Sequence, residues 1–188
     1  MPVVPTVEQP DNDDLRDMYE RLEAGPLGNL NVFKTMAHNP KMLRDWVRMA
    51  TPLLTGGLSL EPRLREIAIL RVAQNAGSEY EFGHHIPIAR QCGITDEEIA
   101  ELQDFEESEH YSELERALVH YVDAASRLTP DAPDRARELK RWLSDRELVE
   151  LSFCIGHWGM VARVLVPLEV ELDPKLEATL PENWREWL

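Results

Sequence analysis

The sequence predicts an all-α protein, and three observations support this prediction. Apolar residues recur every three to four positions along most of the 188 residues, which is the spacing of one face of a helix. The Ser/Thr-x-x-Glu signature of a helix start precedes such runs at Thr95, Ser112 and Ser144. No segment shows the alternation of apolar and polar residues that indicates a strand. Typical helix lengths then suggest a bundle of roughly eight to ten helices.

The first third of the chain is expected to hold an extended arm and three helices. Prolines near the N-terminus lack backbone donors and resist helix formation. Helical apolar spacing follows, interrupted by glycine and proline stop signals. In order, the expected elements are an arm over residues 1–11, a helix from Asn12 ended by Gly25 and Pro26, a short helix over residues 30–37, and a helix from Pro40 ended by Gly56 and Gly57.

Two consecutive helices in the middle of the chain are its most apolar segments. The first is expected to begin near Pro62 and to end at Gly77, a residue type that suits a helix C-cap. The second is expected over residues 78–91, with Gly93 as its C-cap. Because apolar residues crowd these helices on several sides, they are predicted to lie at the centre of the fold.

The last half of the chain continues the helical pattern. The expected elements are a helix from Thr95 to about Phe105, a solvated acidic connection over residues 104–113, a helix from Ser112 ended by Thr129 and Pro130, an amphipathic helix over residues 134–143, and a long helix from Ser144 toward Leu168 in which Gly156 and Gly159 allow close helix contact. Residues 12–172 are thus expected to form one all-α domain. The tail over residues 173–188 is expected to pack on the body or on a neighbouring subunit, since Trp184 and Trp187 are poorly suited to free solvent.

Composition limits the classes of function. The formal charge is −15, from 35 acidic and 20 basic residues, which disfavours binding to nucleic acid or to an anionic membrane surface. Cys92 and Cys154 form no C-x-x-C pair, so neither a disulfide framework nor a thiolate metal site is expected. The N-terminus lacks the pattern of a secretory signal, and no apolar run looks long enough to span a bilayer. A cytoplasmic protein that acts on a small molecule is therefore expected.

Proton-handling residues gather where the two apolar helices meet. Ser78, Glu81 and His85 are spaced i, i+3 and i+7, so on a helix they share one face. Glu66 lies in the preceding helix, which can fold back toward them. This pattern is typical of an acid–base site.

Each of these residues also has an ordinary structural explanation. Ser78-x-x-Glu81 is itself a capping-box signature, and Glu81 with His85 could be a surface pair at i, i+4. Glu66 could be a solvated carboxylate near a helix start. The functional hypothesis is favoured because all of them fall within the two most apolar helices, where solvent exposure of every polar residue would be hard to accommodate.

The same region resembles a known family, the carboxymuconolactone decarboxylase family, which includes the alkylhydroperoxidase D (AhpD) type proteins. The resemblance covers about residues 60–102, and residues 156–165 are a weaker echo of the family's last helix. The resemblance implies an AhpD-like helical bundle that assembles into trimers or hexamers. Its motifs here are the runs Arg65 to Ala73, Gly77 to His85 and Ala89 to Glu98.

The resemblance also implies which chemistry the chain lacks. In the peroxidase branch a C-x-x-C motif is followed four residues later by histidine, with a glutamate about one helix upstream. Here Ser78 and Glu81 occupy the two cysteine positions, His85 matches the histidine, and Glu66 matches the glutamate. A hydroxyl and a carboxylate cannot form a disulfide, so thiol peroxidase activity is not expected at this place. Cys92 lies about two turns beyond His85 and is a poor substitute.

The chain therefore looks like the decarboxylase side of the family, which keeps the glutamate and the histidine. This implies a cofactor-free, lyase-like enzyme acting on a small unsaturated lactone or keto acid, in which an enolate is formed and reprotonated. Isomerisation, hydration and retro-aldol reactions share this chemistry and stay open. The expected roles are His85 as the acid–base group, Glu81 and Glu66 as relay or orienting carboxylates, Tyr80, His84 and Ser78 as substrate-binding groups, and Arg71 or Arg163 as a cation for an anionic substrate.

Three other hypotheses remain beside the lyase. Glu81-x-x-His84 and Glu107-x-x-His110 share the spacing of carboxylate-bridged di-iron bundles, and His157 could join His84 in a zinc site or, equally, His85. The favoured expectation is that there is no metal. A peroxidase-type activity rests on family membership alone. A non-catalytic oligomeric member would leave the site residues exposed or used only as caps.

Overall fold

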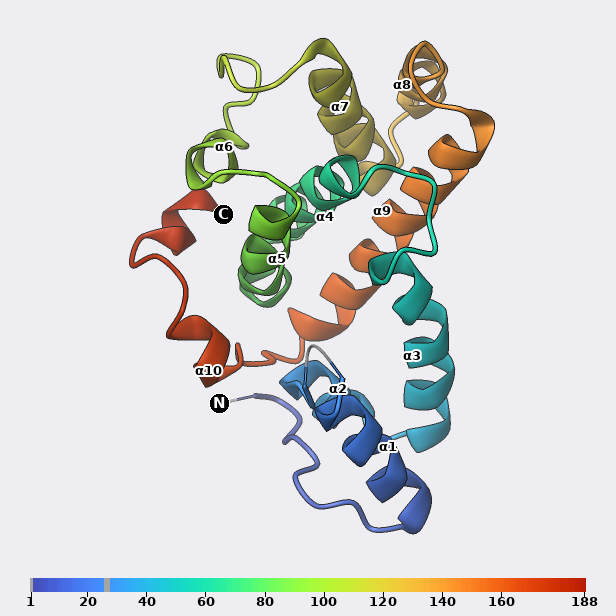
Figure 1. Cartoon of the computed structure of the whole chain (residues 1–188), viewed down its shortest axis with the longest axis vertical. Coiled ribbons are helices and arrows are strands. Elements are labelled where there is room, and N and C mark those ends of the chain that lie inside the picture. The colour runs from blue at the N-terminus through green and yellow to red at the C-terminus, as the bar shows by residue number, and fades with distance from the viewer. Residues whose placement is uncertain (1, 26–27) are drawn as a thin grey trace.

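The protein is an all-helical bundle, as predicted, with no strand among the residues that a computed structural model describes, 2–25 and 28–188 (Figure 1). Met1 and the expected helix stop at Pro26 lie outside these ranges. The helices are α1 (Asp13–Glu23), α2 (Asn31–Met36), α3 (Pro40–Leu54), α4 (Pro62–Ala76), α5 (Glu79–Gln91), α6 (Asp96–Glu101), α7 (Glu113–Arg127), α8 (Ala132–Leu139), α9 (Asp145–Leu165) and α10 (Pro174–Glu177), followed by the 3-10 helix η1 (Trp184–Trp187).

Helix α4 forms the centre of the main core. It packs against α5, α7 and α9, and its side chains are buried on nearly every side, as the crowding of apolar residues predicted (Figure 1). Ile67, Ile69 and Leu70 are almost completely buried, which removes apolar surface from water and stabilises the fold. Because α4 and α5 adjoin, Glu66 on one helix faces the polar residues of the other.

A second apolar cluster joins the N-terminal helices to the end of α9. Leu15 of α1, Val32 of α2 and Leu43 of α3 pack there with Leu165. The arm also lies on its own chain, since the Val3 N–H donates to the carbonyl oxygen of Leu168 at 2.9 Å. This cluster places α3 against the same helix, α9, that borders the candidate site.

The C-terminal segment runs from the end of α9 around the outside of α5 to α6 (Figure 1). Trp184 is 2% exposed and stacks on Phe82 with ring centroids 6.5 Å apart. The Gln74 side-chain amide donates to the carbonyl oxygen of Trp187 at 2.6 Å. A tail anchored in this way covers one face of α5, and neither α10 nor η1 was predicted as a helix.

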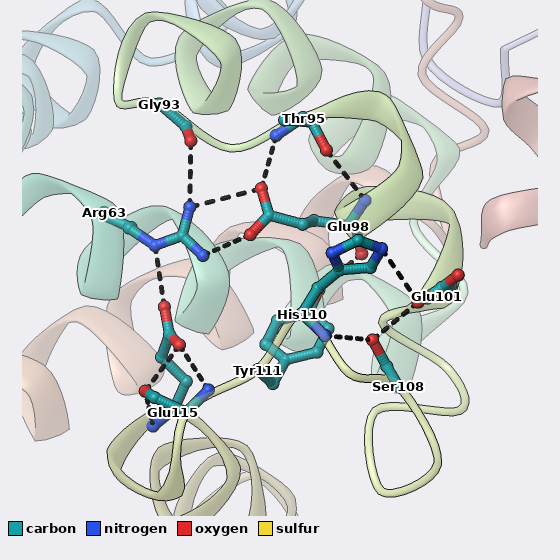
Figure 2. A network of polar contacts seen from close by, with 10 residues as sticks. Arg63, Gly93, Thr95, Glu98, Glu101, Ser108, His110, Tyr111 and Glu115 are labelled. Carbon is teal, nitrogen blue, oxygen red and sulfur yellow. Dashed lines mark hydrogen bonds and ion pairs between the residues drawn. The ribbon is translucent and has the colours of Figure 1, made fainter.

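The acidic connection between α6 and α7 is less solvated than predicted. Helix α6 ends at Glu101 rather than near Phe105, and Tyr111 in the connection is buried. Figure 2 shows the reason: Arg63 donates to Glu98 at 2.6 Å and to Glu115 at 2.7 Å, so one cation holds α6 and α7 against α4. The Tyr111 hydroxyl also donates to the carbonyl oxygen of Glu98, which ties the connection to α6, whereas the acidic side chains of the connection are exposed, as predicted.

Four further expectations differ from the structure. Helix α8 covers residues 132–139 instead of 134–143, and α9 ends at Leu165, before Pro167. Gly156 faces open space, so it makes no close helix contact within the chain. Among the described helices, α9 has the length and apolar composition to cross a membrane, which the sequence did not suggest, although 50% of its most apolar window is buried, as in the core helix of a soluble protein.

Candidate active site

The turn between α4 and α5 uses Ser78 as a helix cap. Gly77 adopts the left-handed conformation, with φ of 61°, that ends α4. The Ser78 N–H then donates to the carbonyl oxygen of Ala73 at 2.9 Å, and the Ser78 hydroxyl accepts the Glu81 N–H at 3.4 Å. Because the Ser78 N–H already has a partner, Glu81 does not reach back to it.

Glu81 therefore differs from the other glutamates in the same sequence pattern. Three other Ser/Thr-x-x-Glu sites begin helices, and all three close as capping boxes in which the glutamate accepts the N-cap N–H at 2.7–2.8 Å: Thr95 with Glu98, Ser112 with Glu115, and Ser144 with Glu147. Hydrogen bonds from Ser144 lower the pKa of Glu147. Capping explains Ser78, but it does not explain Glu81.

The Glu81 carboxyl group lies in a buried position beside His85. Its Oε2 atom is 3.8 Å from Nε2 of His85, and its side chain is 8% exposed. The structure shows no hydrogen bond to this carboxyl group from any described residue. Burial raises the pKa of Glu81 to about 7, although the neighbouring His85 opposes part of that rise. Glu81 can therefore hold or release a proton near neutral pH.

His85 is fixed by hydrogen bonds at both ring nitrogens. Nδ1 lies 2.7 Å from Oε2 of Glu66, and Nε2 accepts the indole N–H of Trp158 at 2.8 Å. Since an indole nitrogen can only donate, Nε2 carries no proton and Nδ1–H donates to Glu66. Glu66 is 0% exposed and His85 is also buried. The pair is thus held in one tautomer and one orientation.

Arg65 completes this buried network. Its Nε atom donates to Oε1 of Glu66 at 2.7 Å, and both side chains are buried. Burial acts to raise the pKa of Glu66, but the adjacent His85 and Arg65 outweigh that effect and hold it below its ordinary value. Neither Arg65 nor Trp158 was among the expected site residues. A charged residue inside the apolar run of α4 was the sequence signal for Arg65.

Tyr80 and His84 lie elsewhere, with the C-terminal segment. The Tyr80 hydroxyl donates to Oδ2 of Asp173 at 2.8 Å and accepts the Val32 N–H at 3.0 Å. His84 stacks on Tyr80 with ring centroids 4.2 Å apart, and its Nε2 is 3.2 Å from the same Asp173 oxygen. These contacts join α5, α2 and the tail, so the structure does not bring Tyr80 or His84 together with Glu66 and His85.

The two candidate cations have structural partners. Arg71 donates twice to Asp123, at 2.8 Å each, and Arg163 donates to the carbonyl oxygen of Gly159 at 2.7 Å. The cation beside the carboxylates is Arg65.

The groups of the metal hypotheses are dispersed. Glu81 faces His85 whereas His84 faces Asp173, and the nearest carboxylate oxygen to His110 is that of Glu101 at 3.8 Å. Within the described ranges, no three histidine, cysteine or acidic side chains form a group that could hold a metal ion.

The sequence matches a known family over the part of the chain that carries this site. Residues 40–124 match the model of the carboxymuconolactone decarboxylase family, and this range includes Glu66, Ser78, Glu81 and His85. The match covers 85 of the 188 residues, so the chain is similar to this family over slightly less than half of its length. No curated protein sequence matches the chain significantly.

Several solved structures share the fold of this chain over most of its length. A peroxidase-related protein from Silicibacter sp. TM1040 is 18% identical, with 92% of this chain and 94% of that one covered and a TM-score of 0.78. The debrominase Bmp8 is 20% identical, with coverage of 98% and 97% and a TM-score of 0.76. A putative antioxidant defence protein AhpD from Agrobacterium tumefaciens is 24% identical, with coverage of 73% and 94% and a TM-score of 0.67. At these identities the likeness shows the fold.

The two cysteines are free thiols. Burial raises the pKa of Cys154 to about 12, and burial together with the nearby Glu66 raises the pKa of Cys92. Arg65 lies 4.0 Å from the Cys92 sulfur but does not reverse that shift. Because the thiolate is the reactive form, neither cysteine is activated for attack on a peroxide.

Proposed function

We propose that this protein is an acid–base enzyme in which Glu81 transfers the proton. The observation that carries the proposal is the Glu81 carboxyl group, which is buried beside His85 and is not used as a helix cap. The expected class of reaction is decarboxylation, or a related enolate-forming step, on a small unsaturated lactone or keto acid. The match to the family model supports this class, because Glu66, Glu81 and His85 lie within the matched residues.

The proposed step balances with one proton from the protein. The bond between the substrate carbon and its carboxylate breaks, carbon dioxide leaves, and the electron pair stays on the substrate as an enolate. The protonated Glu81 then donates its proton to that carbon and becomes a carboxylate. A carboxyl group with a pKa near the working pH suits both this donation and reprotonation by water.

The other buried residues would position and stabilise this group. His85 Nε2 lies beside the Glu81 carboxyl, while Glu66 fixes the His85 ring through Nδ1. Arg65 keeps Glu66 ionised. The role of proton donor thus moves from His85, as first expected, to Glu81, because both nitrogens of His85 are already hydrogen-bonded. Substrate entry requires side-chain movement, since Glu66, Glu81 and His85 are all buried.

The experiment is a screen of unsaturated lactones and β-keto acids with matched glutamate variants. Glu81→Gln removes the proton donor, while Glu147→Gln changes a glutamate that comes from the same sequence pattern but closes a cap. We expect Glu81→Gln to lower kcat by roughly 100-fold or more, and Glu147→Gln to keep wild-type turnover. Equal turnover by the two variants would contradict the proposal.

Two further variants separate this chemistry from a thiol reaction. His85→Ala is expected to lose most activity, because it removes the buried ring beside the Glu81 carboxyl group and opens that position to water, whereas Cys92→Ser should retain activity. Peroxide reduction is measured in parallel on the same preparations. Peroxide turnover that disappears in Cys92→Ser would favour the peroxidase alternative instead.

A further inference from the structure

Two ring nitrogens near the candidate site have no hydrogen-bond partner. Nε1 of Trp46 on α3 and Nδ1 of His157 on α9 are both covered, and no described residue bonds to either atom. The two rings lie nearly parallel, with centroids 6.1 Å apart and planes at 12°. His157 is 6% exposed. Leaving buried polar atoms unpaired costs free energy, so two such atoms side by side point to a partner that the free chain lacks.

Exposed apolar side chains flank both rings in the same way. Met42 and Met49 stand at i−4 and i+3 from Trp46, so they share its face of α3. Phe153 and Met160 stand at the same offsets from His157 on α9, and all four side chains are exposed. We call these six residues the Trp46–His157 surface. Its composition suits an apolar molecule, and methionine side chains adapt readily to one.

The surface adjoins the candidate active site through Trp158. The His157 and Trp158 rings meet edge to face with centroids 4.8 Å apart, and the Trp158 ring lies 5.4 Å from that of His85. Trp158 also donates to His85 Nε2. A molecule seated against Trp46 and His157 would therefore lie one side chain away from the residue that holds His85.

The two nitrogens select for an oxygen acceptor without a full charge. Trp46 Nε1 can only donate, and His157 Nδ1 can donate in the neutral ring. Burial, with His85 nearby, lowers the pKa of His157 to about 4, so this ring is uncharged at neutral pH. Transfer of a carboxylate to such a surface would lack a compensating cation, whereas a carbonyl oxygen carries no such penalty.

We propose that the Trp46–His157 surface binds a planar, largely apolar ring through a carbonyl oxygen that accepts the Trp46 indole N–H and the His157 Nδ1–H. This inference rests on the proposed function, because it assigns the seat of an apolar ring that lies away from the reacting carbon of that enzyme's substrate. Both nitrogens are covered in the free protein, so binding moves the exposed side chains that flank them.

The test uses acetophenone as the probe, with ethylbenzene as a control of similar shape that lacks the oxygen. The full-length protein is labelled with nitrogen-15, and the indole N–H signals of its five tryptophans are followed. Trp46→Phe identifies the Trp46 signal. We expect acetophenone to change the chemical shift of the Trp46 indole N–H as a hydrogen bond forms. Ethylbenzene has no acceptor and should not cause this change. The affinity of each probe is measured from the NMR signals of the probe itself, so that variants without the Trp46 indole can be compared with the wild type.

Variants then separate the hydrogen bond from general packing. Trp46→Phe and His157→Phe keep a ring at each position, and we expect each to weaken acetophenone about fivefold to tenfold, as for loss of one hydrogen bond. Ethylbenzene should bind these variants and the wild type equally. Trp142→Phe is the matched control and should change nothing. Equal affinity for both probes, or an unmoved Trp46 signal at saturating acetophenone, would overturn the inference.

Two other results bear on the same question. If the Trp46 signal moves with protein concentration in the absence of probe, a second copy covers this surface and the inference is wrong. Turnover that depends on Glu81 but is unchanged in Trp46→Phe would also overturn it while leaving the proposed function intact. If acetophenone binds at Trp46 more tightly than ethylbenzene but no candidate substrate is turned over, the proposed function is overturned and the ligand-binding role of the Trp46–His157 surface still holds.

Discussion

Oε2 of Glu81 lies 3.8 Å from Nε2 of His85, yet that nitrogen accepts its hydrogen bond from the Trp158 indole. The two groups are adjacent without being paired. As a result Glu81 keeps a raised pKa, of about 7, instead of being stabilised as an anion. A carboxyl group that is buried, makes no hydrogen bond and has a pKa close to neutral pH destabilises the folded state when ionised, but it is suited to proton transfer. This cost can be measured.

Glu81→Gln is expected to stabilise the protein at alkaline pH. The folded pKa of Glu81 is about 7 against an ordinary 4.5, so the folded state binds more protons than the unfolded state between these values. The contribution of protonated Glu81 to the free energy of unfolding is fully present below about pH 4.5 and is lost as the pH rises to about 7. Above pH 7 the free energy of unfolding of Glu81→Gln should exceed that of the wild type by on the order of 3 kcal/mol, and below pH 4.5 the two should be almost equal.

Urea unfolding across this pH range measures the effect. Glu147→Gln is the control, because the pKa of Glu147 is lowered and its replacement cannot give a gain at high pH. A gain by Glu81→Gln that is the same at pH 4 and pH 8 would show that Glu81 does not titrate near neutrality.

Glu66→Gln is expected to destabilise the protein, in contrast to Glu81→Gln. The substitution leaves the buried Arg65 without its anion, and breaking such a pair costs about 3–5 kcal/mol. Because the pKa of Glu66 is lowered, its contribution is present above the ordinary pKa and is lost as the pH falls through the folded one. Urea unfolding at pH 7 measures the loss.

The matched control is Asp134→Asn, which breaks an exposed pair with Arg137 and should change stability by less than about 0.5 kcal/mol. Similar changes in both variants at pH 7 would mean that the Arg65–Glu66 pair is not the structural support that its burial indicates.

Two helical glycines should respond differently to alanine. A Cβ atom at Gly83 would lie 3.2 Å from Leu172 and 3.3 Å from Leu180, so the C-terminal segment must shift, whereas at Gly156 it would meet no atom within 4 Å. Gly156→Ala should stabilise the protein by about 0.5–1 kcal/mol through helix propensity. Gly83→Ala should be less stable than Gly156→Ala by about 1 kcal/mol or more, since crowding offsets that gain.

Thermal unfolding and limited proteolysis of the C-terminal segment compare the two variants. Faster cleavage near Leu172 in Gly83→Ala is the expected sign of a displaced tail. If Gly156→Ala were the less stable of the two, the packing of the tail on α5 would not be the reason for glycine at position 83.

The thiols are expected to react slowly with oxidants. The pKa of Cys154 is about 12 and that of Cys92 is raised, so few molecules carry a thiolate at pH 7. Hydrogen peroxide should oxidise neither residue faster than it oxidises free cysteine, as measured by mass spectrometry over time. Rapid oxidation of Cys92 that stops in denaturant would reveal an activated thiol and contradict this expectation.

Much of the fold could be predicted from local patterns. Apolar spacing and capping signatures located nine of the helices in the described ranges, because each pattern acts within a few residues. α10 and η1 were missed, since they are short and held by contacts with distant helices. The burial of Tyr111 in the acidic connection was not predicted, because Arg63, which holds the flanking α6 and α7 against α4, lies more than thirty residues away along the chain.

The site was predicted in part. Glu66, Ser78, Glu81 and His85 were selected from spacing and resemblance, and the structure brings them to one junction of α4 and α5. Arg65 and Trp158 were not selected. Trp158 lies 73 positions from His85, so no local pattern connects them.

The sequence by itself determined the all-α class, the resemblance to the family over residues 40–124, and the absence of a cysteine pair at the site, since these depend on residue types and short spacings. Only the tertiary structure decided that the Glu81 carboxyl group is buried and does not serve as a helix cap. In the sequence Ser78-x-x-Glu81 is indistinguishable from three capping boxes, but in the fold the Ser78 N–H is taken by Ala73. One backbone hydrogen bond therefore leaves a carboxyl group unpaired, and burial against α4 and α9 raises its pKa toward neutrality.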